Sequence, residues 1–367
     1  MGTWDGFRFT FTGQAPNNTT NPQLATAPLP SLPPSASIDL NNPGGGLNLL
    51  AIRPDNRNPR TWQYDIQFQQ ELWKNTAFSI GYFGNRGKNL ITYYSPNSNV
   101  VGEPNRPRPY QNINVNVRDD IGRSTYNSLQ AKLERRFSGG FQYLASYTFS
   151  RTNDVSNGVW DNPYGFADVD NLELNFGRSI VDFPHVFSFS SIWEVPFGRG
   201  LKYGSDLNKV ANVFLGGWQL TPIFRIQSGA PFDIRDPDGN LVDLVGDPYS
   251  GNDSPYLNWS AFQQVPTVSG SVGTIPSRVG DMERNSLRQP TNWSLNLGLS
   301  KNFAINERAK VQFRAQAYNL TNTPQRRGLS TWLGGRGATQ APREFGLWYE
   351  THNQSARQLE FGARLEF

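Results

Sequence analysis

The feature that most constrains the fold is a two-residue alternation of apolar and polar side chains that recurs in ten separate segments. In the last of them, Leu359, Phe361, Ala363, Leu365 and Phe367 form the apolar set. They alternate with Gln358, Glu360, Gly362, Arg364 and Glu366. Neighbouring side chains of a strand point to opposite faces. Each segment therefore predicts a β-strand with one apolar face and one polar or charged face.

The other nine segments lie near residues 7–11, 62–68, 78–82, 129–133, 141–149, 187–193, 218–226, 293–299 and 311–317. Their polar positions, with the last strand, carry a row of charges: Lys132, Glu134, Arg136, Arg225, Lys310, Arg314 and Arg364. Such a face needs water, whereas the opposite face needs an apolar medium. A transmembrane β-barrel supplies both, with lipid outside and a wet lumen inside. The charges could tune selectivity or hold a plug, or they could simply satisfy one another.

The connections between these segments alternate in length after the first strand. The long ones span about residues 13–59, 85–123, 152–182, 229–290 and 321–356, and the others are short or medium. Outer-membrane barrels have short periplasmic turns and long extracellular loops. A soluble sandwich lacks this one-sided asymmetry, and no blade motif recurs as in a propeller. The sequence thus predicts an all-β, antiparallel transmembrane barrel of about ten strands with long extracellular loops.

Composition agrees with this interpretation. Hydrophobic residues make up only 37% of the chain, yet aromatics reach 13%, which suits a barrel because only every second strand residue must be apolar. No run approaches the roughly 20 apolar residues of a spanning helix. Aromatic residues near strand ends are interpreted as membrane-interface girdles rather than as a soluble core: Trp62, Trp73, Trp193, Trp218, Trp293 and Phe367.

One segment superficially resembles a calcium loop. Its carboxylate and amide side chains are Asp236, Asp238, Asn240, Asp243 and Asp247. These are hard ligands at alternate spacing, but the bidentate Glu of such loops is replaced by Asp247. Asx and Gly residues also build turns, and turn building is the preferred interpretation.

Other chemistry finds little support. There is no cysteine, and His185 and His352 are the only histidines, so no thiolate or histidine-rich metal site is expected. Neither histidine has a serine elbow that would indicate a nucleophilic triad. The net charge of +4 is scattered along the chain, whereas nucleic-acid binding needs a clustered basic patch. We therefore predict neither an enzyme nor a nucleic-acid-binding protein.

Twelve segments resemble the C-terminal barrel of Oar-like TonB-dependent receptors. They span residues 58–71, 81–87, 126–137, 145–150, 195–200, 216–220, 227–232, 243–248, 284–288, 301–303, 313–319 and the terminal strand. The resemblance covers most of residues 58–367 in family order. It implies an outer-membrane location and a receptor or transport role, with no catalytic residues to carry over.

The resemblance also implies parts that this sequence lacks. Such receptors begin with a signal peptide, a carboxypeptidase-regulatory-like domain, a TonB box and a plug, and they have about 22 strands. The sequence is therefore expected to be the C-terminal half of a larger barrel, with a first strand and loop in residues 1–59 and the barrel segment in residues 60–367. Expected partners are outer-membrane lipid, the upstream barrel and plug, and TonB only through that plug. The alternative is a non-transporting structural or adhesive surface protein.

Overall fold

The computed structural model describes residues 8–10, 47–109, 113–156, 166, 171–304, 310–351 and 356–367. Twelve strands form one sheet, in which every pairing but one is antiparallel. These strands are β1 (Arg8–Thr10), β2 (Leu47–Ile52), β3 (Arg60–Trp73), β4 (Thr76–Tyr94), β5 (Ile113–Ser138), β6 (Phe141–Asp154), β7 (Gly177–Arg178), β8 (His185–Glu194), β9 (Trp218–Gln227), β16 (Asn292–Ala304), β17 (Lys310–Tyr318) and β20 (Gln358–Glu366). All ten predicted strands lie in this sheet, so the predicted all-β antiparallel architecture is confirmed.

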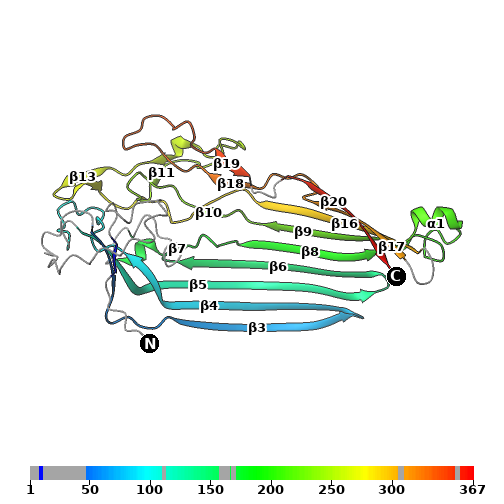
Figure 1. The fold of residues 1–367 in the computed structure, drawn as a ribbon. Helices are drawn as coiled ribbons and strands as arrows, with labels where there is room; N and C mark the ends of the chain where they lie inside the picture. Colours follow the sequence, from blue (N-terminus) through cyan, green and yellow to red (C-terminus); the bar gives the residue numbers. More distant parts are fainter. Residues whose placement is uncertain are drawn as a thin grey trace, which may run out of the picture.

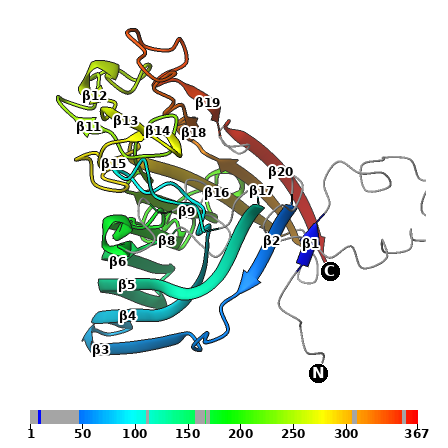
Figure 2. The same cartoon turned by 90° about the vertical axis from the view of Figure 1, so that its left-hand side faces the viewer.

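The sheet is curved but not closed. Nine of its strands are paired in the order β3-β4-β5-β6-β8-β9-β16-β17-β20, which follows the chain, while β1 and β2 form a second branch on β5 and β7 pairs with β6. Figure 2 shows these strands bending around a hollow that stays open on one side. Within the described residues, β3 pairs only with β4 and β20 only with β17. Each of these two outer strands therefore keeps one unpaired edge.

The register aligns the apolar positions of neighbouring strands into continuous rows. Phe361 of β20 pairs with Ala315, and Ala315 pairs with Leu299 of β16. Leu299 in turn pairs with Leu220 of β9. At the other side of the sheet, Phe68 of β3 lies beside Ile80 of β4. A slip of one residue would move a whole row to the other face, so the shared pattern fixes both the register and the apolar face.

Tight turns join strands at one end of the sheet. Two residues, Gly139 and Gly140, connect β5 to β6, and both have positive φ values of 62° and 77°. Positive φ at both central residues is what a two-residue hairpin requires, and glycine adopts it without steric cost. In the β3–β4 turn, Asn75 has a φ of 64°, a conformation that Asn tolerates better than most residues.

Two predicted loops proved shorter than expected. The prediction of a loop over residues 85–123 was wrong at both ends, because β4 continues to Tyr94 and β5 begins at Ile113. The predicted loop 13–59 contains β2, which pairs in parallel with β5 over Ile113–Arg118. Side-chain packing accompanies this pairing, because Val115 of β5 is buried against Ala51 of β2 and Val117. Residues 11–46 of that loop lie outside the described part of the chain, as does the predicted turn at residues 305–307.

The remaining long connections fold into small elements that gather near one end of the sheet (Figure 1). They contain four strand pairs: β10 (Pro231–Phe232) with β15 (Leu287–Arg288), β11 (Asp243–Leu244) with β12 (Phe262–Gln263), β13 (Thr267–Gly270) with β14 (Gly273–Pro276), and β18 (Arg326–Leu329) with β19 (Trp348–Thr351). Two 3-10 helices, η2 (Leu172–Asn175) and η3 (Trp259–Ala261), lie among them. The helix α1 (Lys209–Leu215) lies at the opposite end of the sheet, the end at which the C-terminus lies.

These connections share a hydrophobic core of their own, which we call the loop core. Its buried members are Ile234, Val242, Leu257, Ala261, Phe262, Met282, Leu287, Leu333 and Phe345. They come from two connections, residues 228–291 and 319–357, so the two connections pack as one unit. By contrast, the apolar rows of the outer strands are exposed: Ile66 of β3 and Phe361 of β20 have exposed fractions of 74% and 68%.

None of the helices in the described part of the chain is both long enough and apolar enough to span a bilayer.

Candidate functional site: the lumen wall and the loop assembly

The polar face of the sheet brings the predicted row of charges together. Lys132 pairs with Ser146 of β6, Arg225 with Ser294 of β16, and Arg314 with Ser300. On the last two strands, Gln312 pairs with Arg364 and Lys310 with Glu366. The register thus surrounds these charges with polar positions, as expected of a wall that faces water.

Several of these charges are satisfied by close neighbours on the same face. Lys132 Nζ lies 3.1 Å from Glu134 Oε2, and Arg225 Nη2 donates to Gln227 Oε1 at 2.9 Å. Arg314 Nε donates to Gln312 Oε1 at 2.5 Å. Arg136 lies beyond the last regular pair of β5, where the register shifts, so pairing assigns it no facing residue. Mutual satisfaction, the simpler of the two predicted explanations, accounts for these contacts.

A broad hollow of about 820 Å³ lies at the upper part of this wall. Polar residues from four strands line it, including Arg225, Gln227, Ser294, Asn296 and Gln358. Arg326, at the start of β18, reaches it from the loop side. The hollow therefore lies where the strands of the sheet meet the loops.

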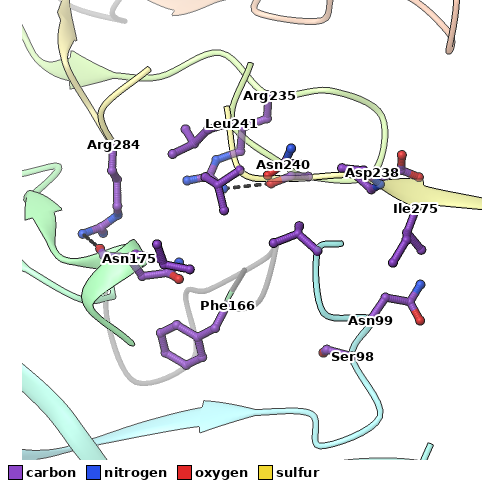
Figure 3. Close-up of a pocket in the computed structure, with 15 residues that line it drawn as sticks. Ser98, Asn99, Phe166, Asn175, Arg235, Asp238, Asn240, Leu241, Ile275 and Arg284 are labelled. Carbon is purple, nitrogen blue, oxygen red and sulfur yellow. Dashed lines mark hydrogen bonds between the residues drawn. The ribbon is translucent and has the colours of Figure 1, made fainter. Parts of the chain in front are cut away.

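A smaller cavity of about 200 Å³ lies inside the loop assembly (Figure 3). Three separate connections line it. Ser98 and Asn99 come from the β4–β5 connection, and Phe166 and Asn175 come from the segment that follows β6. The third connection, between β9 and β16, supplies Arg235, Asp238, Gly239, Asn240, Leu241, Ile275, Pro276, Val279 and Arg284. Convergence of distant loops on one cavity is typical of a binding site on a rigid scaffold.

Two oxygen atoms at this cavity have no hydrogen-bond partner among the described residues. They are Asn240 Oδ1, on a side chain that lines the cavity, and Asp236 Oδ2 just behind it. The other carboxylate oxygen of Asp236 accepts from the backbone N–H groups of Asp238 and Asn240, both at 2.9 Å. Burial raises the pKa of the Asp236 carboxyl above its usual value. A buried acceptor without a partner is costly, so this wall of the cavity favours a group that donates hydrogen bonds.

Buried ion pairs attach the loop assembly to the sheet. Arg284 Nη1 lies 2.6 Å from Asp154 Oδ1 at the end of β6, and both side chains are almost fully buried. Arg288 pairs with the fully buried carboxylate of Asp182, just before β8. Between the two arginines, Asn285 Nδ2 donates to the carbonyl of Arg178 in β7 at 2.7 Å. We call Arg284, Asn285 and Arg288, with these partners, the loop latch.

The sequence reasoning assigned no role to the latch residues, although Arg284 to Arg288 belong to the segments that carry the family resemblance. A signal was present, because buried arginines need carboxylates, and Asp154 and Asp182 lie at predicted strand ends. Their pairing spans more than 100 residues of chain. Such a long-range pairing cannot be read from spacing alone.

The candidate calcium residues do not come together as a ligand set. Asp243 accepts two hydrogen bonds from the Arg278 guanidinium, both at 2.7 Å, and Asp238 pairs with Arg336. Asp236 closes a turn onto Asn240, and Asp247 accepts from the backbone N–H of Tyr249. The described residues contain no group of three or more His, Cys, Asp or Glu side chains that could hold a metal ion. Arginine pairing and turn building occupy the carboxylates of Asp238, Asp243 and Asp247 and one oxygen of Asp236, whereas Asp236 Oδ2 and Asn240 Oδ1 keep no partner among the described residues.

The guanidinium of Arg278, hydrogen-bonded to Asp243, lowers the pKa of that carboxyl. The pKa of Tyr256 is shifted in the opposite direction. Burial raises its pKa to about 12, and its hydroxyl donates to the carbonyl of Arg288 at 2.9 Å. Both groups make hydrogen bonds inside the loop assembly.

His185 lies at the start of β8 on the apolar face, and its Nδ1 is 2.7 Å from the Tyr147 hydroxyl. His352 lies outside the described residues. The predicted interface aromatics fall at the two ends of the strands. Trp62 and Trp293 lie at the loop ends of β3 and β16, whereas Trp73, Trp193, Trp218 and Phe367 lie toward the turn end. Their contact with lipid headgroups stays a prediction.

Comparison with known proteins places the chain in a family. The family described as outer membrane beta barrel domain matches residues 4–360. No curated protein sequence matches.

Three similar solved structures illustrate the likeness. The outer membrane transporter YddB from Escherichia coli is 10% identical, with a TM-score of 0.46, and the match covers 88% of this chain and 34% of that one. The siderophore receptor PiuA from Acinetobacter baumannii is 9% identical, with a TM-score of 0.41, covering 90% and 30%. The pyoverdine receptor FpvA from Pseudomonas aeruginosa is 11% identical, with a TM-score of 0.41, covering 84% and 30%.

This chain thus spans about a third of the length of these structures. The family match extends over nearly all of it. The apolar rows, the polar wall and this match agree: the chain belongs to the outer membrane β-barrel domain family and resides in the outer membrane.

Proposed function

We propose that this chain forms one side of the barrel of an Oar-like TonB-dependent receptor. Its polar face would line the lumen, and its loop assembly would capture a ligand on the cell surface. The observation that carries the proposal is the open, curved sheet with apolar rows outside, a polar wall inside and a packed loop assembly at one end. Transport would be driven by TonB acting through an upstream plug.

The free edges of β3 and β20 support a larger barrel. An unpaired strand edge in hydrocarbon costs several kcal/mol for each unsatisfied group. Further strands of the same protein, inserted between β20 and β3, would satisfy both edges and close the barrel. The open side of the sheet in Figure 2 leaves room for them.

The short turns would face the periplasm and the loop assembly the outside, as in other barrels of this class. The captured ligand would be polar, because Ser98, Asn99 and Asn240 line the cavity and Asn240 Oδ1 has no hydrogen-bond partner among the described residues. Its surface would include hydrogen-bond donors that satisfy Asn240 Oδ1. The loops would thus recognise the ligand, while the lumen wall would conduct it.

The proposal is tested on the intact protein in its own outer membrane. Barrel assembly predicts a membrane-fraction protein whose gel mobility changes on boiling. Receptor function predicts that the periplasmic domain of TonB co-purifies with it. A protein that stays in the soluble fraction and migrates identically before and after boiling would refute the barrel. A heat-modifiable barrel that never retains TonB would refute transport and leave a surface-structural role.

A further inference from the structure

The medium connection between β8 and β9, residues 195–217, carries an unusual number of exposed apolar side chains. On α1, Val210, Phe214, Leu215 and Val213 have exposed fractions of 70%, 66%, 51% and 49%. Val210, Val213 and Phe214 follow the i, i+3, i+4 spacing that places side chains on one face of a helix. The face that a soluble helix would bury is here turned outward.

The helix is well anchored on its polar side, so this exposure is not a fraying effect. Asn208 caps it by accepting from the Ala211 N–H at 2.8 Å. Asn212 Oδ1 accepts from the Arg199 N–H at 2.7 Å, and the Gly216 N–H donates to the Asn212 carbonyl at 3.0 Å. These bonds hold the polar side of α1 against its own connection and leave the apolar stripe free.

Two contacts join the helix to the membrane-facing side of the sheet. Trp218 Nε1 donates to the Phe214 carbonyl at 2.9 Å, and Lys301 Nζ bonds to the carbonyl of Gly216. Trp218 and Lys301 pair with each other on an apolar row. The Lys301 ammonium lies 4.9 Å from the Trp218 ring centre and 5.2 Å from that of Phe303. Covered in this way, Lys301 is only 3% exposed although it occupies an outward-facing position.

The charges of the connection complement a phosphate-bearing surface. Residues 195–217 contain Arg199, Lys202 and Lys209 but only one acidic residue, Asp206. All three basic side chains lie on exposed residues. A helix with an apolar face and neighbouring basic residues binds membrane interfaces by burying that face at the headgroup boundary. The helix also lies at the turn end of the sheet, the end at which the C-terminus lies (Figure 1).

We propose that α1 is an interfacial anchor that inserts Val210, Val213, Phe214 and Leu215 into the inner leaflet of the outer membrane. Arg199, Lys202 and Lys209 would bind the phosphates of its glycerophospholipids. The choice of leaflet rests on the proposed function, which places the short turns in the periplasm. The anchor fixes the depth of the β8–β9 hairpin and keeps the Lys301 ammonium covered at the rim.

The chain contains no cysteine, so a single introduced thiol can carry a polarity-sensitive nitrobenzoxadiazole label. The intact protein bearing Val210→Cys, with any cysteine elsewhere replaced by serine, is labelled and reconstituted in vesicles of phosphatidylethanolamine and phosphatidylglycerol. We expect emission shifted to shorter wavelength, and quenching by lipids spin-labelled near the headgroup. Asp206→Cys, at an exposed acidic position of the same connection outside α1, is the matched control and should show neither effect.

Equal emission and equal quenching at positions 206 and 210 would overturn the anchor. A blue shift at position 210 without quenching by spin-labelled lipid would also overturn it, since protein rather than lipid would then cover the helix. A third label, at Phe361→Cys on the apolar face of β20, separates the two proposals. Failure at both 210 and 361 would refute the membrane barrel, whereas failure at 210 alone would refute only the anchor.

Discussion

At the scale of single residues, the loop latch concentrates the largest electrostatic contributions. Arg288 forms an ion pair with Asp182, and the Asp182 side chain has no exposed surface. Removing one partner of a buried pair leaves the other charge uncompensated, at about 3–5 kcal/mol. We expect Arg288→Ala to release the loop assembly from the sheet, with much faster proteolysis within residues 229–290 of the intact protein in detergent.

Arg278 provides the matched control for this prediction. It also pairs with an aspartate of the same connection, but its side chain is 53% exposed. The Asp243 side chain is 11% exposed, but the guanidinium is largely solvated, which weakens the pair, so Arg278→Ala should speed proteolysis less than Arg288→Ala does. Equal rates for the two variants would contradict the view that burial gives the latch its strength.

Two aspartates of the loop assembly should respond to pH in opposite directions. The folded state raises the pKa of Asp236 because burial disfavours its charge, so this group destabilises the fold increasingly as pH rises above the ordinary aspartate range. Asp236→Asn should therefore slow hydrogen exchange of the loop amides at neutral pH. It should have no such effect in acid, where the natural carboxyl is already protonated.

Asp243 has a lowered pKa, because the hydrogen-bonded Arg278 guanidinium favours its charged form. Its contribution to stability is complete above the ordinary aspartate pKa and disappears as pH falls through the lower folded value. Asp243→Asn should thus speed exchange at neutral pH and converge with the natural protein in acid. The same sign of effect for Asp236→Asn and Asp243→Asn at neutral pH would contradict this assignment.

For single residues, the sequence predicted the face of the sheet on which a side chain lies, but it did not predict which residues form ion pairs. Alternation alone placed Lys132, Arg225 and Arg314 on the polar face, because successive side chains of a strand point to opposite faces of the sheet. It could not pair Arg284 with Asp154 or Arg278 with Asp243, since those contacts depend on how long loops fold back. The aspartates suggested as calcium ligands illustrate the difference, because arginines distant in sequence bind two of them.

At the scale of elements, β20 offers two adjacent small residues on opposite faces. Ala363 lies in the apolar row beside Phe313, and Gly362 lies in the polar row beside Arg314. An arginine on the lipid face near the bilayer centre costs about 2–4 kcal/mol, whereas a lumen position tolerates it. We expect Ala363→Arg to lower the urea concentration that unfolds the vesicle-embedded protein.

Gly362→Arg is the control, because a Cβ atom added at Gly362 meets no atom within 4 Å. It should unfold close to the natural midpoint. A larger loss for Gly362→Arg than for Ala363→Arg would reverse the assignment of the two faces.

Strand ends were predicted less well than strand centres, and the reason is physical. β4 and β5 extend well past their alternating parts, to Tyr94 and from Ile113. At about 3.3 Å per residue, 26 residues of β5 exceed the roughly 30 Å of hydrocarbon. Beyond the membrane a hairpin face need not be apolar, so alternation weakens along the end of β4. At the start of β5, Ile113, Val115 and Val117 do alternate with polar residues, and this signal was missed inside a segment rich in Asn and Pro.

At the scale of the whole molecule, apolar side chains fall into two populations. Those of the sheet face outward in rows, whereas those of the loop core are enclosed by the loops themselves. Leu257 and Phe345 belong to the loop core, with exposed fractions of 2% and 4%. The protein therefore contains a sheet adapted to lipid and an assembly folded like a soluble domain.

This division predicts separable stabilities. Leu257→Ala deletes buried methyl groups at a cost of about 2–5 kcal/mol, all of it within the loop assembly. Calorimetry of the intact protein should show a loop transition moved to lower temperature, with the heat-modifiable gel mobility of the barrel retained. Loss of that mobility in Leu257→Ala would show that barrel and loops fold as one unit.

The central claim is that alternate residues of each strand face lipid and water, and β20 allows the most direct measurement. The chain has no cysteine, so once any cysteine elsewhere in the intact protein is replaced by serine, single thiols can be placed in turn at positions 358–365 and tested in the outer membrane. Each is then treated with a water-soluble, membrane-impermeant maleimide. The account predicts a two-residue period, with reaction at positions 358, 360, 362 and 364 and protection at 359, 361, 363 and 365. Uniform reactivity along the strand, or the opposite phase, would contradict it.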